Sequence, residues 1–298
     1  MNKNICFIIN PASGTGKWKG VEENIKKYLS PEFTPIIQYT KYHGHATILA
    51  EDAAENCSVI IGVGGDGIMN EVAAGMMSTS AILGIIPAGS GNALANHFGI
   101  PLGQKDAIEC INKMHTSTVD TAIVNSRPFL AVAGTGFDAE VATMFAESKR
   151  RGFFSYIYLS VIKYLTYKPS EYELVIDGKS YTRKAFVISV ANGSQYGNNA
   201  YISPEASTKD GLLDACILRP FTVFSGTVIL YRLFRKTMHH SPFLEIIRGK
   251  KIEIRKAKKN EKLCLHYDGE PGGKVDEIKI SIVPRSLRII TPEDHGRI

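Results

Sequence analysis

Cysteine is scarce in this sequence and follows no pattern. The five cysteines are odd in number, widely separated and without a CxxC pair (Cys6, Cys57, Cys110, Cys216 and Cys264). Neither a disulfide framework nor a cysteine-ligated zinc site is therefore indicated, and the reducing cytoplasm is the simplest expectation for its location.

Long apolar runs and proline are scarce too. The first apolar run, residues 5–9, ends at Asn10-Pro11 and is too short for a signal-peptide core, and no segment reaches about 18 uninterrupted apolar residues. The 13 prolines, 44% hydrophobic residues and 21% charged residues exclude disordered and collagen-like classes. We expect a globular protein without a leader or a membrane span, and its 298 residues, roughly twice the usual domain length, predict two domains.

Only a small excess of one charge sign is present. The chain has 35 Lys and Arg against 29 Asp and Glu, a formal net charge of +6. This balance mildly favours phosphates, anionic lipid or nucleic acid as partners, and it selects none of them.

The first 120 residues show an alternation of strand and helix patterns. Strand-like runs are predicted at residues 5–9, 36–40, 58–63 and 81–87, and helical spacing at residues 18–29, 45–55, 67–77, 93–98 and 105–114. The alternation predicts an α/β N-terminal domain with a parallel sheet and helices on both faces.

From about residue 119 the pattern changes to closely spaced strands. They are predicted at residues 119–124, 129–132, 171–176, 183–191, 212–218, 251–255, 262–267 and 277–283. Helical stretches at residues 138–167, with a break near Gly152, and at residues 222–237 interrupt them. This pattern predicts a C-terminal antiparallel domain, a β-sandwich or a flattened barrel.

Glycine-rich loops follow three of the predicted N-terminal strands, at residues 10–17, 62–67 and 87–92. The carboxyl ends of parallel strands share one edge of a sheet, so the three loops are expected to converge. Glycine lets the backbone approach a polyphosphate closely, and backbone amides then donate to its oxygens. A single such loop is also typical of an ordinary turn, but three together favour one phosphate-binding site.

Two common nucleotide motifs do not fit these loops. Trp18 follows Lys17 where a Walker A motif requires Ser or Thr, which argues against a P-loop NTPase. Residues 62–67 have the spacing GxGxxG, but Asp66 would place a carboxylate beside a dinucleotide pyrophosphate and repel it. A Rossmann dehydrogenase is therefore a poor fit.

Asp66 lies between glycines in the second loop. A carboxylate at a phosphate site is repelled unless it holds Mg²⁺ or accepts a proton from an attacking hydroxyl. A helix N-cap is the alternative interpretation of this residue.

Five motifs, in this order, resemble the diacylglycerol kinase catalytic-domain family, which includes bacterial soluble diacylglycerol kinases and the sphingosine and ceramide kinases. They are residues 10–14 (NPASG), 64–71 (GGDGIMNE), 87–95 (PAGSGNALA), 134–138 (GTGFD) and 268–270 (DGE). The resemblance covers nearly the whole chain. It implies an NAD kinase/diacylglycerol kinase-like nucleotide-binding domain over residues 1–120, a β-rich lipid-binding domain over residues 121–284, and the return of residues 285–298 to the first domain.

By this resemblance, ATP binds to the glycine-rich loops and to residues around them. The implied residues are Asn10, Ser13, Gly14, Thr40, Gly64, Gly65, Gly67, Asn70, Glu71, Gly89, Ser90, Gly91 and Asn92, with Arg150 and Arg151 brought to the phosphates. A solvated helix end is the alternative interpretation of the basic residues 149–151.

The resemblance also implies roles for acidic residues. Asp66, Asp268 and Glu270 are predicted to act as one catalytic unit, in which Asp268 or Glu270 orients the hydroxyl. A tight hairpin turn is the alternative for residues 267–271. Asp138 matches a position that in sphingosine kinases faces the lipid head group.

A structural Mg²⁺ site is implied at residues 209–214. Asp210, with the backbone carbonyls of Ser207 and Leu212, supplies the hard oxygen ligands that this ion prefers. An ordinary Asp-Gly turn is the alternative.

The activity implied is Mg²⁺-dependent transfer of the γ-phosphoryl group of ATP to the hydroxyl of a lipid, either diacylglycerol or a sphingoid base. NAD kinase is a second interpretation because it shares the Gly-Gly-Asp-Gly and Asn-Glu elements, although residues 87–92 and 268–270 favour a lipid kinase. A catalytically silent nucleotide- or lipid-binding regulator is a third, against which the three retained acids argue. No nucleic-acid partner is expected, and a homo-oligomer is compatible with the sequence.

A lipid substrate also predicts peripheral contact with a membrane surface. Residues 221–240 combine apolar side chains with Arg232, Arg235 and Lys236, a combination that suits an anionic bilayer. The alternative is an ordinary helix with its apolar stripe in the core.

Overall fold

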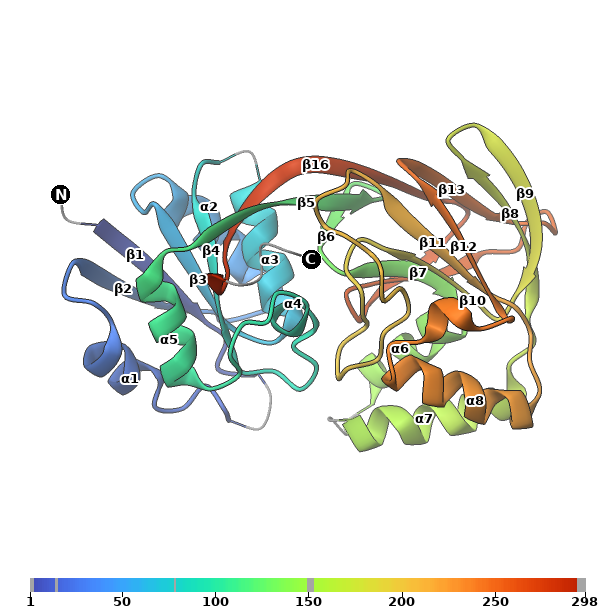
Figure 1. Cartoon of the computed structure of the whole chain (residues 1–298), viewed down its shortest axis with the longest axis horizontal. Coiled ribbons are helices and arrows are strands. Elements are labelled where there is room, and N and C mark those ends of the chain that lie inside the picture. Colours follow the sequence, from blue (N-terminus) through green and yellow to red (C-terminus); the bar gives the residue numbers. More distant parts are fainter. Residues whose placement is uncertain (1–2, 14–15, 78, 149–152, 294–298) are drawn as a thin grey trace. The chain divides into compact units, whose positions relative to one another are not determined.

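The structure is a computed structural model that describes residues 3–13, 16–77, 79–148 and 153–293. The chain divides into unit 1, residues 1–120 and 284–298, and unit 2, residues 121–283. It passes from unit 1 to unit 2 within strand β5 (Thr116–Val124) and returns within strand β16 (Ile278–Ile290) (Figure 1).

Unit 1 contains a parallel sheet with the strand order β2-β1-β3-β4-β16. The strands new here are β1 (Lys3–Ile9), β2 (Phe33–Tyr39), β3 (Val59–Gly64) and β4 (Ile82–Pro87). Because β2 and β3 pair with opposite sides of β1, the direction in which strands are added reverses there. Open α/β sheets bind their ligands beyond the carboxyl ends of the strands at such a reversal, here between β1 and β3.

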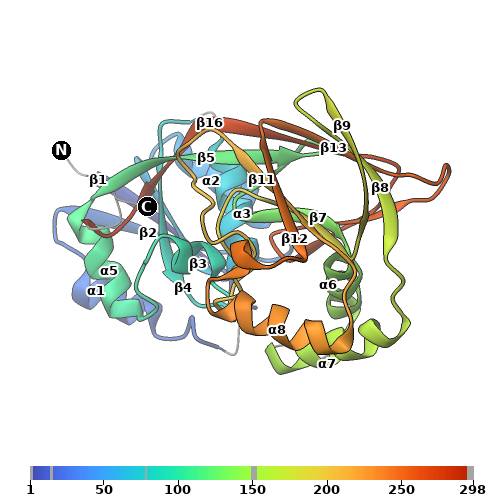
Figure 2. The same cartoon turned by 45° about the vertical axis from the view of Figure 1, so that its right-hand side comes forward.

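Helices cover both faces of this sheet, as the sequence predicts (Figures 1 and 2). They are α1 (Val21–Tyr28), α2 (His45–Ala54), α3 (Asp66–Met76), α4 (Ala93–His97) and α5 (Gln104–Lys113). Apolar side chains of α1 and α5, such as Ile25 and Ile108, pack with Phe7 of β1 on one face. On the other face α2 and α3 approach closely at Gly75, where a Cβ would lie 2.3 Å from the Thr47 carbonyl oxygen.

Unit 2 is a β-sandwich of antiparallel strands, which confirms the predicted fold class. One layer has the order β9-β8-β13-β16, with β5 pairing with β16 and with β6, and the other layer has the order β12-β11-β10-β7-β14-β15. Its strands are β6 (Arg127–Phe129), β7 (Val132–Gly136), β8 (Ser170–Ile176), β9 (Lys179–Ala185), β10 (Val187–Ala191), β11 (Leu213–Leu218), β12 (Leu244–Gly249), β13 (Lys251–Lys256), β14 (Leu263–Tyr267) and β15 (Glu270–Val275). Alternate residues such as Leu174, Ile188, Ile217 and Ile254 fill the core between the layers.

Three helices belong to unit 2: α6 (Phe137–Glu147), α7 (Phe153–Thr166) and α8 (Val223–Phe234). A short 3₁₀ turn, Met238–His240, follows α8. Within the described ranges, no helix has both the length and the apolar character that crossing a membrane requires.

The structure differs from the sequence expectation at several strands, and the predicted strand 129–132 is only the end of β6 and the start of β7, with residues 130–131 in neither. β12 and β15 were not predicted, and the sequence of β15, with Pro271, Gly272 and Gly273, is typical of a turn; pairing with β14 makes it a strand. The predicted strand 183–191 is two strands, because the chain crosses at Phe186 from β9 in one layer to β10 in the other. Such a crossing leaves no signal in the hydrophobic pattern.

Candidate active site

The three glycine-rich loops meet at the carboxyl ends of β1, β3 and β4 in unit 1. A Cβ on Gly89 would lie 2.3 Å from the Gly65 Cα, so the second and third loops touch backbone to backbone, an approach that only glycine permits. A Cβ on Gly64 would lie 2.6 Å from Ser13 Oγ in the first loop. The convergence predicted from the sequence is therefore present in the fold.

Asp66 is the first residue of α3 and contacts a neighbouring helix rather than capping its own. Its Oδ1 accepts a hydrogen bond from the Leu94 N–H of α4, 3.2 Å away, while the N-cap of α3 is Gly65. Burial raises the pKa of the Asp66 carboxyl, and backbone N–H groups of α4 act in the opposite direction. A carboxyl with a raised pKa beside a phosphate-binding loop is suited to accept a proton.

Asn70 adds an oxygen without a partner to this site. It lies one turn after Asp66, on the same side of α3, and its buried Oδ1 has no hydrogen-bond partner among the described residues. A carboxylate and an amide oxygen are hard ligands of the kind Mg²⁺ prefers. The unpartnered oxygen of Asn70 therefore fits as one ligand of a magnesium ion near the start of α3.

Glu71 has a different place from the other predicted ATP-binding residues. Its carboxylate accepts hydrogen bonds from the N–H groups of Gly44 (2.8 Å) and Ala46 (3.1 Å), and His43 Nδ1 lies 2.9 Å away. These contacts hold the start of α2, whose N-cap Gly44 has no side chain to do so. Glu71 therefore positions the start of α2.

Two asparagines close the loops from within. Asn92, at a φ of 48°, accepts from the Gly89 N–H (3.0 Å) and donates to the Gly89 carbonyl (3.1 Å). Asn10 Oδ1 accepts from the Ala12 N–H at 2.9 Å. Both side chains therefore shape the loops that we expect to bind phosphate.

The remaining predicted ATP-binding residues of unit 1 lie in or beside these loops. Ser90 is the exposed residue of the third loop, and Gly91 follows it; Gly67 is the second residue of α3. The Thr40 N–H donates to the Ile9 carbonyl at the end of β1. Gly14, Arg150 and Arg151 lie outside the described residues.

Asp268 of unit 2 directs its carboxylate at the protein's own backbone. It accepts hydrogen bonds from the N–H groups of Leu130 (2.8 Å), Ala131 (2.8 Å) and Val132 (3.0 Å), before and at the start of β7. With Gly269 it forms the two-residue turn between β14 and β15, with φ values of 45° and 82°. The hairpin interpretation is thus confirmed, and Glu270, half-buried, begins β15 opposite Tyr267.

Asp138, the second residue of α6, is the centre of a buried polar cluster. Its Oδ2 is 3.0 Å from Ser189 Oγ, 3.2 Å from the Tyr196 hydroxyl and 3.0 Å from His266 Nε2, and its Oδ1 accepts from the Ala139 N–H. The His266 side chain is only 3% exposed. Burial, with the nearby charge of Asp138, raises the pKa of Tyr196 well above its ordinary value, so its hydroxyl stays a donor. We call Asp138, Ser189, Tyr196 and His266 the Asp138 cluster.

Sequence reasoning found Asp138 and missed its three partners. Ser189, Tyr196 and His266 lie 51, 58 and 128 positions further along the chain. The one signal in the sequence was that His266 stands two residues before Asp268 of the fifth motif. In the structure His266 lies on β14, and its cross-strand partner on β7 is Gly134 of the fourth motif. Beside Tyr196, the buried Gln195 side chain has no hydrogen-bond partner for either amide atom in the described part of the chain.

The predicted structural metal ligands form an Asp-Gly turn. Asp210 Oδ1 accepts from the Leu212 N–H at 3.0 Å, Gly211 has a φ of 71°, and Ser207 Oγ accepts from the Lys209 N–H. Among the described residues no group of three or more His, Cys, Asp or Glu could hold a metal ion. A Mg²⁺ bound through one carboxylate and two carbonyls stays a prediction.

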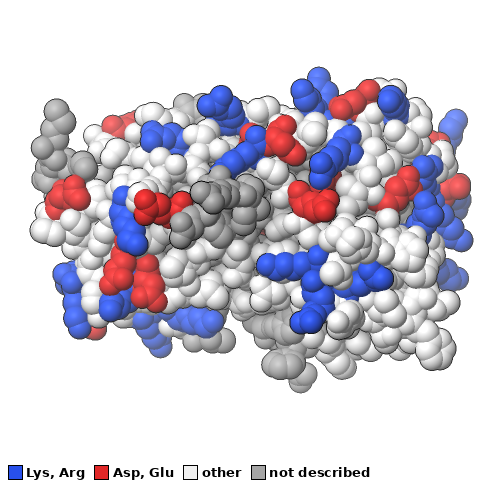
Figure 3. All heavy atoms as spheres, in the orientation of Figure 1, with Lys and Arg blue, Asp and Glu red and all other residues white. Residues whose placement is uncertain are grey.

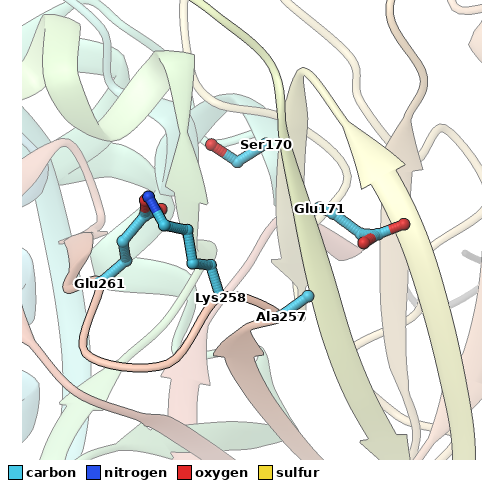
Figure 4. Close-up of a pocket in the computed structure, with 5 residues that line it drawn as sticks. All are labelled: Ser170, Glu171, Ala257, Lys258 and Glu261. Carbon is cyan, nitrogen blue, oxygen red and sulfur yellow. The ribbon is translucent and has the colours of Figure 1, made fainter.

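A separate small pocket lies in unit 2 and contains none of the predicted site residues (Figure 4). Its lining residues are Ser170, Glu171, Ala257, Lys258 and Glu261. Lys258 Nζ pairs with Glu261 Oε1 at 2.8 Å, and in Figure 4 Glu171 points away from this pair. This pocket offers no catalytic group.

Comparison with known protein families matches both units. Residues 4–124 match the diacylglycerol kinase catalytic domain, and residues 131–291, more than half of the chain, match the YegS C-terminal NAD kinase beta sandwich-like domain. The two matched segments fall on the α/β part and on the sandwich, respectively.

Individual proteins resemble the chain over most of its length. A diacylglycerol kinase of Bacillus subtilis is 26% identical over 98% of this chain and 97% of its own, and a probable lipid kinase YegS-like protein of Klebsiella pneumoniae is 28% identical over 87% and 86%. A crystal structure of a diacylglycerol kinase from Bacillus anthracis shares the fold with a TM-score of 0.74 at 22% identity, covering 98% of this chain and 97% of that one. The chain therefore belongs to the lipid kinase family that joins a diacylglycerol kinase catalytic domain to a YegS-type C-terminal β-sandwich.

Proposed function

We propose that the protein transfers the γ-phosphoryl group of ATP to the hydroxyl of a lipid, with diacylglycerol as the first substrate to test. The observation that carries this proposal is the convergence of three glycine-rich loops around Asp66. Membership of the lipid kinase family supports the reaction class, and the name of the Bacillus subtilis relative supports the choice of diacylglycerol.

The phosphate side of the reaction is assigned to unit 1. Backbone N–H groups of the glycine-rich loops bind the phosphate oxygens. Gly65 and Gly89, which approach each other closely, have no side chains that would cover these N–H groups. The unpartnered Oδ1 of Asn70 would be a ligand of Mg²⁺ there. When bound, this ion neutralises charge that develops on the transferred group.

The hydroxyl side of the reaction is assigned to acidic residues. Asp66 accepts the proton, because its raised pKa matches it to that task better than a fully solvated carboxyl. Asp268 acts by fixing the backbone at residues 130–132, and Glu270 is the acid of the turn proposed to orient the hydroxyl. Asp138, whose Oδ2 has three donors, holds α6 in place and contributes to head-group binding.

Labelled ATP distinguishes the candidate reactions directly. We expect a radioactive phospholipid from [γ-³²P]ATP and diacylglycerol in detergent micelles, with less product from sphingosine and none from NAD. Detergent micelles present the lipid without a bilayer, so the result does not depend on membrane docking. Product from NAD alone would favour the NAD kinase interpretation. ATP binding without transfer to any acceptor would favour a regulator.

A further inference from the structure

Helices α7 and α8 carry all of the large hydrophobic side chains that are exposed in the described part of unit 2. These side chains are Tyr156, Ile157, Tyr158, Val161, Ile162 and Leu165 on α7, and Val223, Phe224, Val228, Leu230, Tyr231 and Phe234 on α8. We call these twelve residues the α7–α8 face.

The exposure of this face is large. Phe224 is 88% exposed and Leu165 is 79% exposed, and Ile229 is the one buried residue of α8. The ordinary arrangement, an apolar stripe turned into the core, therefore does not account for the apolar residues of α8. Contiguous apolar surfaces of this kind mark sites of contact with a partner.

The two helices form one surface and are anchored from below. They lie side by side in both views (Figures 1 and 2), and the ring of Tyr164 stacks on that of Phe221, at 6.0 Å, directly before α8. Phe186 packs under both, with its ring centroid 4.6 Å from Phe221 and 5.9 Å from Tyr164. The inner sides of these segments are thus packed on the sandwich while their outer sides have no cover.

The charges carried by the two helices themselves have one sign, and Glu140 of α6 pairs with Lys163 of α7. No Asp or Glu occurs in residues 148–170 or in residues 215–244. Arg232, Arg235 and Lys236 lie at the carboxyl end of α8, and in the described part of the chain no carboxylate forms an ion pair with them. Arg232 contacts the Thr237 carbonyl, and Arg235 and Lys236 lie over the rings of Tyr231 and Tyr201. Figure 3 shows Lys and Arg side chains bordering a largely uncharged surface over α7 and α8.

We propose that the α7–α8 face docks the protein on an anionic lipid bilayer. Apolar side chains that enter the acyl region beside cations that stay at the head groups are the combination that binds such a surface. A second copy of this chain is a poorer occupant, because a two-fold contact would bring cations toward cations with no carboxylate on either helix. The inference deepens the proposed function, since a lipid kinase must reach a substrate held in a bilayer.

Binding to vesicles is measured without nucleotide, so its outcome does not depend on whether the protein catalyses phosphoryl transfer. Purified full-length protein is sedimented with vesicles of phosphatidylcholine alone or with phosphatidylglycerol added, at low and high salt. We expect strong binding to the anionic vesicles at low salt and weaker binding at high salt, because salt screens charge attraction beyond about 10 Å at 0.1 M. Equal binding to both kinds of vesicle, or to neither, overturns the proposal.

Two sets of variants separate the apolar and the charged contributions. We expect Phe224→Ser with Leu165→Ser to lower the partition coefficient by about tenfold or more at either salt concentration. Changing Arg232, Arg235 and Lys236 to Ser should lower it by about a hundredfold at low salt and less at high salt. The matched controls are Ile48→Ser with Leu102→Ser, which are exposed apolar residues of unit 1, and Lys179, Lys184 and Lys251 to Ser.

A fluorescent reporter tests which residues enter the lipid. The chain has one tryptophan, Trp18 in unit 1, so Trp18→Phe with Phe224→Trp gives a single reporter on the face. A blue shift on adding anionic vesicles, with an unchanged monomeric mass in their absence, supports the proposal. The proposal is overturned if the protein sediments with the vesicles but its fluorescence emission does not shift. It is also overturned if the emission shifts without vesicles because the protein self-associates.

Discussion

The two units use their carboxylates in opposite ways. In unit 1 the Asp66 carboxyl accepts a hydrogen bond from the Leu94 N–H; burial raises its pKa, and the backbone N–H groups at the start of α4 only partly offset this rise. In unit 2 the carboxylate of Asp268 accepts three backbone hydrogen bonds, and Asp138 Oδ2 has three side-chain donors. A buried carboxyl with a raised pKa is suited to proton transfer, whereas a carboxylate held by several donors fixes the segments that carry those donors.

Replacing Asp66 gives the largest expected effect and tests the reactive side of this comparison. We expect Asp66→Asn to lower kcat by about 10²–10⁴-fold, because the amide cannot accept the proton of the hydroxyl. The measurement is ³²P transfer to diacylglycerol in micelles, with circular dichroism to confirm folding. Turnover near that of the wild type in a folded variant would remove Asp66 from the catalytic unit.

Replacing Asp268 tests the structural side. Asp268→Ala leaves three backbone N–H groups at residues 130–132 without this acceptor, and we expect a loss of about 2–4 kcal/mol in the free energy of unfolding. Urea denaturation in the presence of a chelator measures the loss, and under that condition Asp210→Ala serves as a matched control because that turn carboxylate has one backbone contact. If Asp268→Ala unfolds like the wild type but loses turnover, Asp268 belongs with Asp66 rather than with the structural carboxylates.

The Asp138 cluster tests whether a saturated carboxylate can also bind substrate. We expect His266→Leu to cost about 1–3 kcal/mol in stability, because a buried partner of Asp138 is lost. If the cluster also positions the lipid head group, KM for lipid rises while KM for ATP stays constant. A rise of both KM values together would indicate a general loss of structure instead.

The implied structural Mg²⁺ has a smaller expected effect. If Asp210 holds the ion, a chelator should lower the wild-type melting temperature through the loss of about 1–3 kcal/mol of binding free energy, and the Asp210→Ala variant should not respond. Identical melting curves of the wild type with Mg²⁺ and with chelator would leave Asp210 as a residue of the Asp-Gly turn alone.

The raised pKa of Asp66 predicts how the stability and the turnover of the protein depend on pH. The folded state binds this proton more tightly than the unfolded state, so the ionised carboxylate destabilises the fold as pH rises from the ordinary carboxyl range through the raised pKa. We therefore expect Asp66→Asn to be more stable than the wild type at neutral pH, with the difference vanishing at acid pH. Wild-type turnover falls as pH falls through the same pKa. A variant less stable than the wild type at neutral pH would contradict this assignment.

Much of unit 1 follows from local sequence. The alternation of apolar strands and amphipathic helices predicts the parallel sheet, and glycine after three strands predicts where the loops meet. These signals are local because periodicity and the freedom of glycine act over a few residues. Even so, the sequence did not show that Glu71 holds the start of α2, because that contact joins residues 25 and 27 positions apart.

Unit 2 depended on tertiary structure to a greater degree. The motif at residues 134–138 predicted a role for Asp138, but its partners come from β10, the loop that follows it and β14. Likewise, β15 is a strand because β14 pairs with it, in spite of its proline and glycines.

The sequence by itself determined the order of strands and helices in unit 1, the glycine-rich loops and the acidic residues in them, because each depends on neighbours along the chain. Only the tertiary structure decided which carboxylates are satisfied and which apolar side chains are covered. Hydrogen-bond partners and burial come from segments far apart in sequence, and helix periodicity alone does not say whether a stripe such as that of α8 meets a core. For this reason the resemblance of the motifs predicted the family, whereas the α7–α8 face is identified by the exposed fractions of its side chains in the fold.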